Sequence, residues 1–125
     1  MPLISGGDRY QAMFTALDDM VAPDSEARVI DAFVDSLDLE AMGFERAEAP
    51  ELGRPAYEPG CLLKLYLYGY RNGVRSSRKL ERACEVNVEV MWLLGELKPD
   101  FRTIANFRRD NASCLKAVFK EFVRR

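Results

Sequence analysis

The chain has 125 residues, 48% of them hydrophobic and 30% charged, which is typical of one compact globular domain. Its apolar runs are too short for a membrane span, and the start, MPLISGGDRY, lacks the features of a signal peptide, so we expect a cytoplasmic protein that makes no membrane contact. There is no histidine, and the three cysteines, Cys61, Cys84 and Cys114, are widely spaced. This pattern argues against a zinc site and a disulfide framework, so we expect no metal, no cofactor and three buried cysteines that act as small hydrophobic residues.

Charge is distributed unevenly along the chain, although the net charge is only −2. Residues 1–60 contain four Lys or Arg and thirteen Asp or Glu, a balance of −9, whereas residues 61–125 contain fourteen and seven, a balance of +7. This asymmetry suggests that the basic part meets a polyanion while the acidic part faces away or folds against the basic part. The alternative is a chance polarity of solvated helix faces.

In chain order, the first elements are acidic helices. Residues 1–7 are predicted to be loosely ordered, and residues 8–42 to form helices, the second of which begins with Asp24 as its amino-terminal cap. Helical spacing places Val29, Ile30, Phe33, Val34 and Leu37 on an apolar face. The other face is predicted to be solvated rather than to bind metal, and it contains Arg28, Asp31, Asp35 and Asp38.

A loop and a buried helix follow. Residues 43–60 contain three glycines and three prolines, which predicts a linker loop packed on the core. Residues 61–70, CLLKLYLYGY, are apolar on every face except at Lys64, which predicts a central buried helix that ends near Gly73. The tyrosines are predicted to lie in the core, the alternative being that they stack on bases; they are Tyr66, Tyr68 and Tyr70.

Short capped helices make up the rest of the basic half. They are predicted to end near residues 86, 94 and 110 and at the end of the chain. The predicted amino-terminal caps are Ser76 or Ser77, Asn87 and Asp100, and Asn111 is predicted to start the last helix. Apolar residues on these helices, including Trp92 and Phe119, are predicted to form the core.

Two short helices separated by a turn, the second with exposed polar residues, are typical of a helix-turn-helix. We predict that the helix over residues 100–110 reads the major groove, where Arg pairs with guanine and Asn with adenine. Its solvent-facing candidates are Arg102, Thr103, Asn106, Arg108 and Arg109. Phosphate contacts set register without reading sequence, and a neighbouring basic segment suits them, with Arg75, Arg78 and Lys79 near its start and Arg82 on the same outer surface.

Several motifs in residues 53–111 point to a known family. The runs GRPAY, LLKLYLYGY, RSSRKLER, NVEVMWLLG and PDFRTIANFRRDN occur in this order, and in them the chain resembles the N-terminal helical domain of bacterial insertion-sequence transposases of the DDE type. The runs LDDMV, RVIDAFVDSLDL and LKAVFKEFV extend the resemblance to nearly the whole chain. With the helix patterns, the resemblance implies a single all-α domain of about six short helices over residues 1–125, with a basic, helix-turn-helix-like core over residues 61–125.

The resemblance also implies a function. Such a domain would recognise the terminal inverted repeats of an insertion sequence in double-stranded DNA and help to assemble the transposase. The alternative is an interaction module that forms a homodimer, or pairs with or inhibits the full-length transposase, without reading DNA. An exposed basic stripe would favour DNA binding, whereas arginines paired to the acids of residues 1–60 would favour the interaction module.

Catalysis is not expected of this chain. The family cuts and joins DNA with two metal ions held by Asp, Asp and Glu on an RNase H-like sheet, and the resemblance implies that the first catalytic Asp lies beyond residue 125. The chain has no alternating strand pattern that could form this sheet. It ends in EFVRR inside a predicted helix, as expected of a truncated gene or an excised domain.

Overall fold

The computed structural model describes residue 12 and residues 15–45 and 57–124, so the predictions for residues 1–7 and for most of the 43–60 loop lie outside the described residues. The regular elements of the described chain are all helices. They are a helical segment at 15–20, α2 (Glu26–Asp35), α3 (Pro59–Asn72), α4 (Ser77–Val86), α5 (Val88–Leu93), α6 (Phe101–Asp110) and α7 (Ala112–Val123). The predicted all-α class is confirmed.

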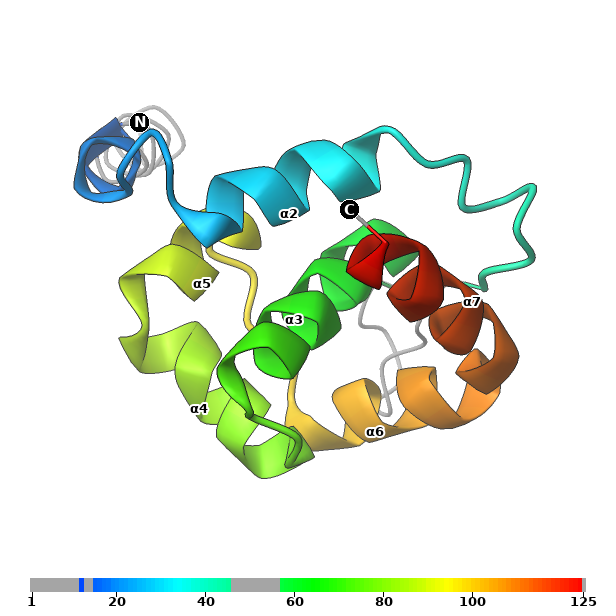
Figure 1. Ribbon diagram of the computed structural model, residues 1–125. Coiled ribbons are helices and arrows are strands. Elements are labelled where there is room, and N and C mark those ends of the chain that lie inside the picture. Colours follow the sequence, from blue (N-terminus) through cyan, green and yellow to red (C-terminus); the bar gives the residue numbers. More distant parts are fainter. Residues whose placement is uncertain (1–11, 13–14, 46–56, 125) are drawn as a thin grey trace, which may run out of the picture.

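Helix α3 lies at the centre of the fold, as its sequence predicts. In Figure 1 it crosses the middle of the molecule, with α2 on one side and α6 on the opposite side. A helix that is apolar all round is stable in water only when other elements cover all its faces. Four leucines of α3 have no exposed surface; they are Leu62, Leu63, Leu65 and Leu67.

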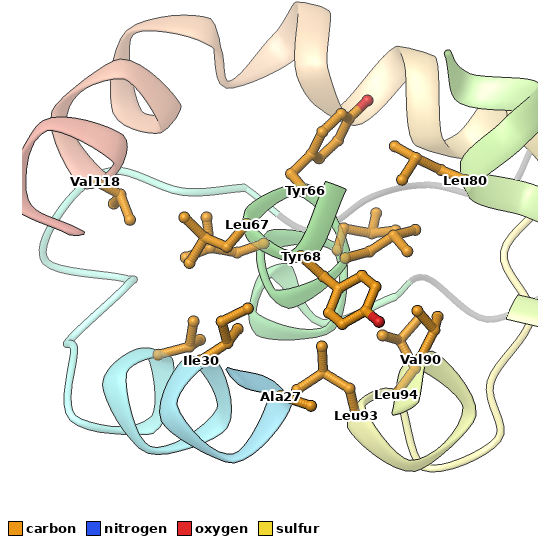
Figure 2. Close-up of a cluster of buried hydrophobic side chains, with 14 of the residues drawn as sticks. Ala27, Ile30, Tyr66, Leu67, Tyr68, Leu80, Val90, Leu93, Leu94 and Val118 are labelled. Atoms are coloured by element: carbon orange, nitrogen blue, oxygen red, sulfur yellow. The ribbon is translucent and has the colours of Figure 1, made fainter. Parts of the chain in front are cut away.

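The tyrosines of α3 divide between core and surface. Figure 2 shows Tyr66 and Tyr68 pointing to opposite sides of α3. The Tyr66 hydroxyl donates a hydrogen bond of 2.5 Å to the Ile104 carbonyl of α6, and the Tyr68 hydroxyl donates one of 2.6 Å to Glu89 of α5. The core prediction is wrong for Tyr70, which is 44% exposed because it lies on the last turn of α3, beside the exposed residues 71–73.

Most helix ends follow the predicted caps. The side chains of Ser76, Asn87 and Asp100 accept hydrogen bonds from the backbone amides of residues 79, 90 and 103, respectively. Gly73 ends α3 with a left-handed φ of 72°. Helix α3 begins at Pro59, inside the predicted loop, because proline lacks the amide hydrogen that the first helical position leaves unused.

One cap differs from the prediction. Ser25, rather than Asp24, caps α2, and its hydroxyl accepts a hydrogen bond from the Ala27 amide. Asn111 stands at the start of α7, as predicted, but its side chain makes no capping hydrogen bond, because its oxygen accepts a hydrogen bond of 2.9 Å from the Glu45 amide. The Asn111 side chain therefore joins two distant parts of the chain instead of capping its own helix.

The acidic helix α2 folds against α3 through ion pairs. The Lys64 ammonium group lies 2.8 Å from Asp31 Oδ1 and 2.9 Å from Asp35 Oδ1, and Arg71 pairs with Glu26. The predicted solvated face is confirmed for Asp35, whose side chain is 63% exposed, whereas Asp31 is partly covered where it contacts Lys64. These pairs hold acids of the first half on the side of α3 that faces α2.

Some predicted core residues are only partly covered. Val29 is 55% exposed, because the buried face of α2 centres on Ala27, Ile30, Phe33 and Val34. Trp92 and Phe119 are half-buried at the edge of the core. The Trp92 ring lies under the Arg28 guanidinium group, and its Nε1 donates a hydrogen bond of 3.0 Å to Asp18.

The cysteines have different surroundings. Cys84 is fully buried as predicted, whereas Cys61 and Cys114 are half-buried, and all three are free thiols. Burial raises the pKa of the Cys61 thiol to about 11 and that of Cys84 to about 12, which keeps both protonated at neutral pH. No helix of the described chain is long and apolar enough to cross a membrane.

Candidate nucleic-acid interface

The first turns of α4 and α6 lie side by side, joined by one aromatic ring. The Arg78 guanidinium carbon is 4.0 Å from the ring centroid of Phe101, and that of Arg102 is 5.8 Å from the same centroid. The Phe101 amide donates a hydrogen bond of 3.2 Å to the Glu81 carboxylate of α4. Two arginines from different helices therefore meet where both helices present their positive amino-terminal ends.

Helix α6 has a clear inner and outer face. Thr103, Ile104 and Phe107 are buried. The remaining polar residues at helical spacing form the outer stripe of α6, which we define as Arg102, Asn106 and Arg109. The two arginines are exposed, and Asn106 is half-buried. This stripe has the composition predicted for the reading helix.

The prediction that Thr103 faces solvent is wrong. Its side chain is only 1% exposed, and its amide donates a hydrogen bond of 2.8 Å to Asp100 Oδ1. The position lies beside Ile104 and Phe107 among the buried residues of α6. Thr103 is therefore a packing residue of α6.

Arg108 lies on a different face from the outer stripe. It is about 100° around the helix from Arg109, because an α-helix has about 3.6 residues per turn. It lines a hollow between α3, α6 and α7, with Arg75 and Lys116. Burial raises the pKa of Tyr66 to about 12, and the positive charge of Arg108 acts in the opposite direction.

None of the nine candidate residues forms an ion pair with the acidic half of the described chain. Arg82 pairs with Glu85 at 3.4 Å and Arg109 pairs with Asp110 at 3.0 Å, so both contacts are local. Among the described residues the other five basic candidates form no ion pair, and all are exposed; they are Arg75, Arg78, Lys79, Arg102 and Arg108. The acids of α2 pair instead with Lys64 and Arg71, which lie outside the candidate set.

The packing around α6 differs from a simple pair of consecutive helices. In the described chain α6 packs chiefly on α4, while α5 packs on α2, α3 and α4. Helix α4, rather than α5, is therefore the main neighbour that positions the outer stripe. A helix-turn-helix made by α5 and α6 remains a prediction from sequence.

Sequence reasoning missed Phe101 as the link between two arginines, and it missed Lys116. Phe101 is the first residue of α6 and Lys116 lies on the surface of α7. They meet residues of other helices, so the local sequence does not indicate the contact. Within the part of the chain that the structure describes, no group of His, Cys, Asp or Glu side chains could hold a metal ion.

Comparison with known families adds one finding. A family model described as "Transposase domain (DUF772)" matches residues 15–110, a range that spans α2 to α6 and includes the outer stripe. Curated proteins and solved structures give no significant match.

Proposed function

The chain belongs to the DUF772 transposase domain family, and we propose that it is the DNA-binding and assembly domain of a DDE-type insertion-sequence transposase. In this proposal it recognises the terminal inverted repeats of the element in duplex DNA. The catalytic carboxylates belong to another part of the transposase, so this chain cuts no DNA by itself.

One observation supports DNA binding most directly, namely the sorting of charge around α3. Acids of α2 are held by Lys64 and Arg71 on one side of α3. The exposed cations of α4 and α6 lack ion pairs to the acidic half within the described chain. Most of these cations form no ion pair within the described chain, and exposed cations without partners of their own are suited to a polyanion.

In the proposal, α6 contacts the bases and α4 contacts the phosphates. The outer stripe of α6 offers guanidinium and amide groups, which form paired hydrogen bonds with guanine and adenine edges in the major groove. The first turn of α4 offers Arg78 and Lys79 beside backbone amides, an arrangement suited to phosphates. Arg75 and Arg82 flank this turn and extend the phosphate-binding surface in the proposal.

The test is the salt dependence of binding to the terminal repeats, measured by fluorescence anisotropy. Each neutralised phosphate contributes about −0.9 to the slope of log K against log salt. Arg78→Ala or Lys79→Ala is expected to weaken binding to all sequences alike and to reduce the slope by about one. Arg124→Ala is the control, because Arg124 is exposed on the end of α7, away from both helices. Absence of salt-dependent binding by the unaltered chain would contradict the proposal.

Self-association is the second candidate function, and exposed apolar side chains in the acidic half favour it. Met20 is 66% exposed and Val29 is 55% exposed. A homodimer, or a pair with the full-length transposase, would cover these side chains and leave α4 and α6 free for DNA. Sedimentation of the unaltered chain and of Val29→Ser tests this candidate, which requires a concentration-dependent dimer that the substitution weakens.

A further inference from the structure

A hollow beside the outer stripe combines apolar walls with a positive rim. It has a volume of about 440 Å³ and lies between α3, α6 and α7. Tyr70 of α3 and Phe119 of α7 form part of its wall, and their ring centroids are 5.3 Å apart at an interplanar angle of 41°. Arg75, Arg108 and Lys116 surround these rings. The volume is within the range of about 300–1,000 Å³ that small-molecule sites usually have.

The charges of this rim are all of one sign. No acidic side chain lines the hollow. Within the described residues none of the three cations forms an ion pair, and all three are exposed. An aromatic wall beside uncompensated cations suits a ligand that has both a planar ring and an anionic group.

We propose that the hollow binds an unpaired nucleotide of the DNA that the outer stripe holds, with its base stacked on Tyr70 and its phosphate among the three cations. The inference rests on the proposed function, because it assigns the hollow to the same DNA. Arg108 adjoins Arg109 of the outer stripe, so a strand that leaves the duplex at α6 reaches the rim within a short distance.

The chemistry favours a nucleotide over a peptide. Each nucleotide has a base and a phosphate at fixed spacing, and proteins that bind single strands combine a cationic groove with aromatic side chains on which bases stack. The exposed ring of Tyr70 offers such a surface. A peptide would need an acidic and an aromatic side chain at matching positions.

The experiment compares two probes that share one duplex of mixed sequence. One is a blunt duplex, and the other is the same duplex with a run of unpaired adenines at one end. The unaltered chain is expected to bind the second probe about tenfold more tightly, since one stacked base contributes about 1–3 kcal/mol. 2-Aminopurine in the unpaired run should lose fluorescence on binding.

Tyr70→Ala is expected to remove the preference for the unpaired run and to leave binding to the blunt duplex unchanged. Tyr70→Phe should retain the preference, because the ring is kept. Lys116→Ala should reduce the preference without removing the duplex binding. Lys98→Ala is the matched control, since Lys98 is an exposed cation that does not line the hollow. Thermal unfolding of each variant shows whether it is folded.

The outcomes separate this inference from the proposed function. Equal binding of both probes by the unaltered chain would overturn the inference and leave duplex recognition in place. A lower affinity of Tyr70→Ala for both probes alike would also overturn it. Loss of self-association in Tyr70→Ala, with the preference intact, would assign the hollow to a protein contact. Absence of binding to either probe would overturn both.

Discussion

The guanidinium group of Arg78 lies 4.0 Å from the ring centroid of Phe101, and this contact joins the start of α4 to the start of α6. Phe101 is the first residue of α6, so its ring sets where the helix begins relative to α4. The guanidinium carbon of Arg102, the next residue of α6, lies 5.8 Å from the same ring centroid. An aromatic side chain that need not touch DNA therefore positions two cations that are proposed to do so.

Phe101→Ala is accordingly expected to weaken both stability and DNA binding. Loss of two cation–π contacts should lower the free energy of unfolding by about 1–2 kcal/mol. DNA affinity should fall because Arg78 and Arg102 lose their common support. Urea unfolding and anisotropy measure the two effects, and Phe101→Tyr, which keeps the ring, is the control. Unchanged affinity in a destabilised Phe101→Ala would show that the arginines need no such support.

The two faces of α6 predict different effects for neighbouring substitutions. Asn106→Ala should cost about 1–3 kcal/mol of binding free energy on the terminal repeat and much less on random duplex DNA. Arg108→Ala should change the blunt-duplex affinity little, because Arg108 lines the hollow instead of the outer stripe. Equal losses for Asn106→Ala on both DNAs would reduce the outer stripe to phosphate binding.

Glu89 predicts a dependence of stability on acid pH. Its carboxylate accepts hydrogen bonds from the Ser25 and Tyr68 hydroxyl groups, and these bonds lower the pKa of Glu89. The stabilisation is fully present above the unfolded-state pKa and is lost as the pH falls through the lower pKa of the folded state.

Glu89→Gln should therefore lower the free energy of unfolding at neutral pH by about 1.5–3 kcal/mol, because a neutral amide replaces the charged acceptor. The difference from the unaltered chain should shrink in acid. Melting temperatures over a pH series measure it, with Glu85→Gln as a control, since Glu85 pairs only with the exposed Arg82 in the described chain. A difference that does not change with pH would contradict this account.

Gly69 of α3 lies against the turn between α3 and α4, where a larger side chain would clash. A Cβ atom at this position would lie 2.5 Å from the Val74 carbonyl oxygen and 2.8 Å from Leu80 Cδ2. Backbone cannot yield easily, so Gly69→Ala should cost about 1–3 kcal/mol. Gly73→Ala provides a contrast, because it meets no atom within 4 Å but has a φ of +72°. It should cost about 1–2 kcal/mol from backbone strain alone. Urea unfolding of both variants tests the distinction, and an unaltered stability of Gly69→Ala would refute it.

Features that depend on local sequence were predictable here. The apolar surface of residues 61–70 predicts a buried α3. The caps at Ser76, Asn87 and Asp100 depend on hydrogen bonds from amides three residues further along the chain. The all-α class follows from such signals.

Features that depend on contacts between helices were not predictable. In the sequence, nothing distinguishes Asp31 and Asp35 from other surface acids, and only the packing of α3 on α2 places Lys64 beside them. Thr103 is polar, and only the packing of α6 shows that it lies inside. Arg75 and Lys116 are far apart in sequence, so no spacing rule places them around one hollow.

Figure 1 shows α2 and α6 on opposite sides of α3, so acids beside α2 and arginines of α6 lie apart in the described chain. Exposed acids at Asp24, Asp38 and Glu40 border α2, and exposed arginines lie on α6. If the chain binds DNA as proposed, this separation of charge would give a torque in the field of the nucleic acid before any contact forms, and the torque would turn α6 toward the phosphates. A protein with almost no net charge would then arrive already oriented, and its opposite pole would discourage a second duplex from approaching α2.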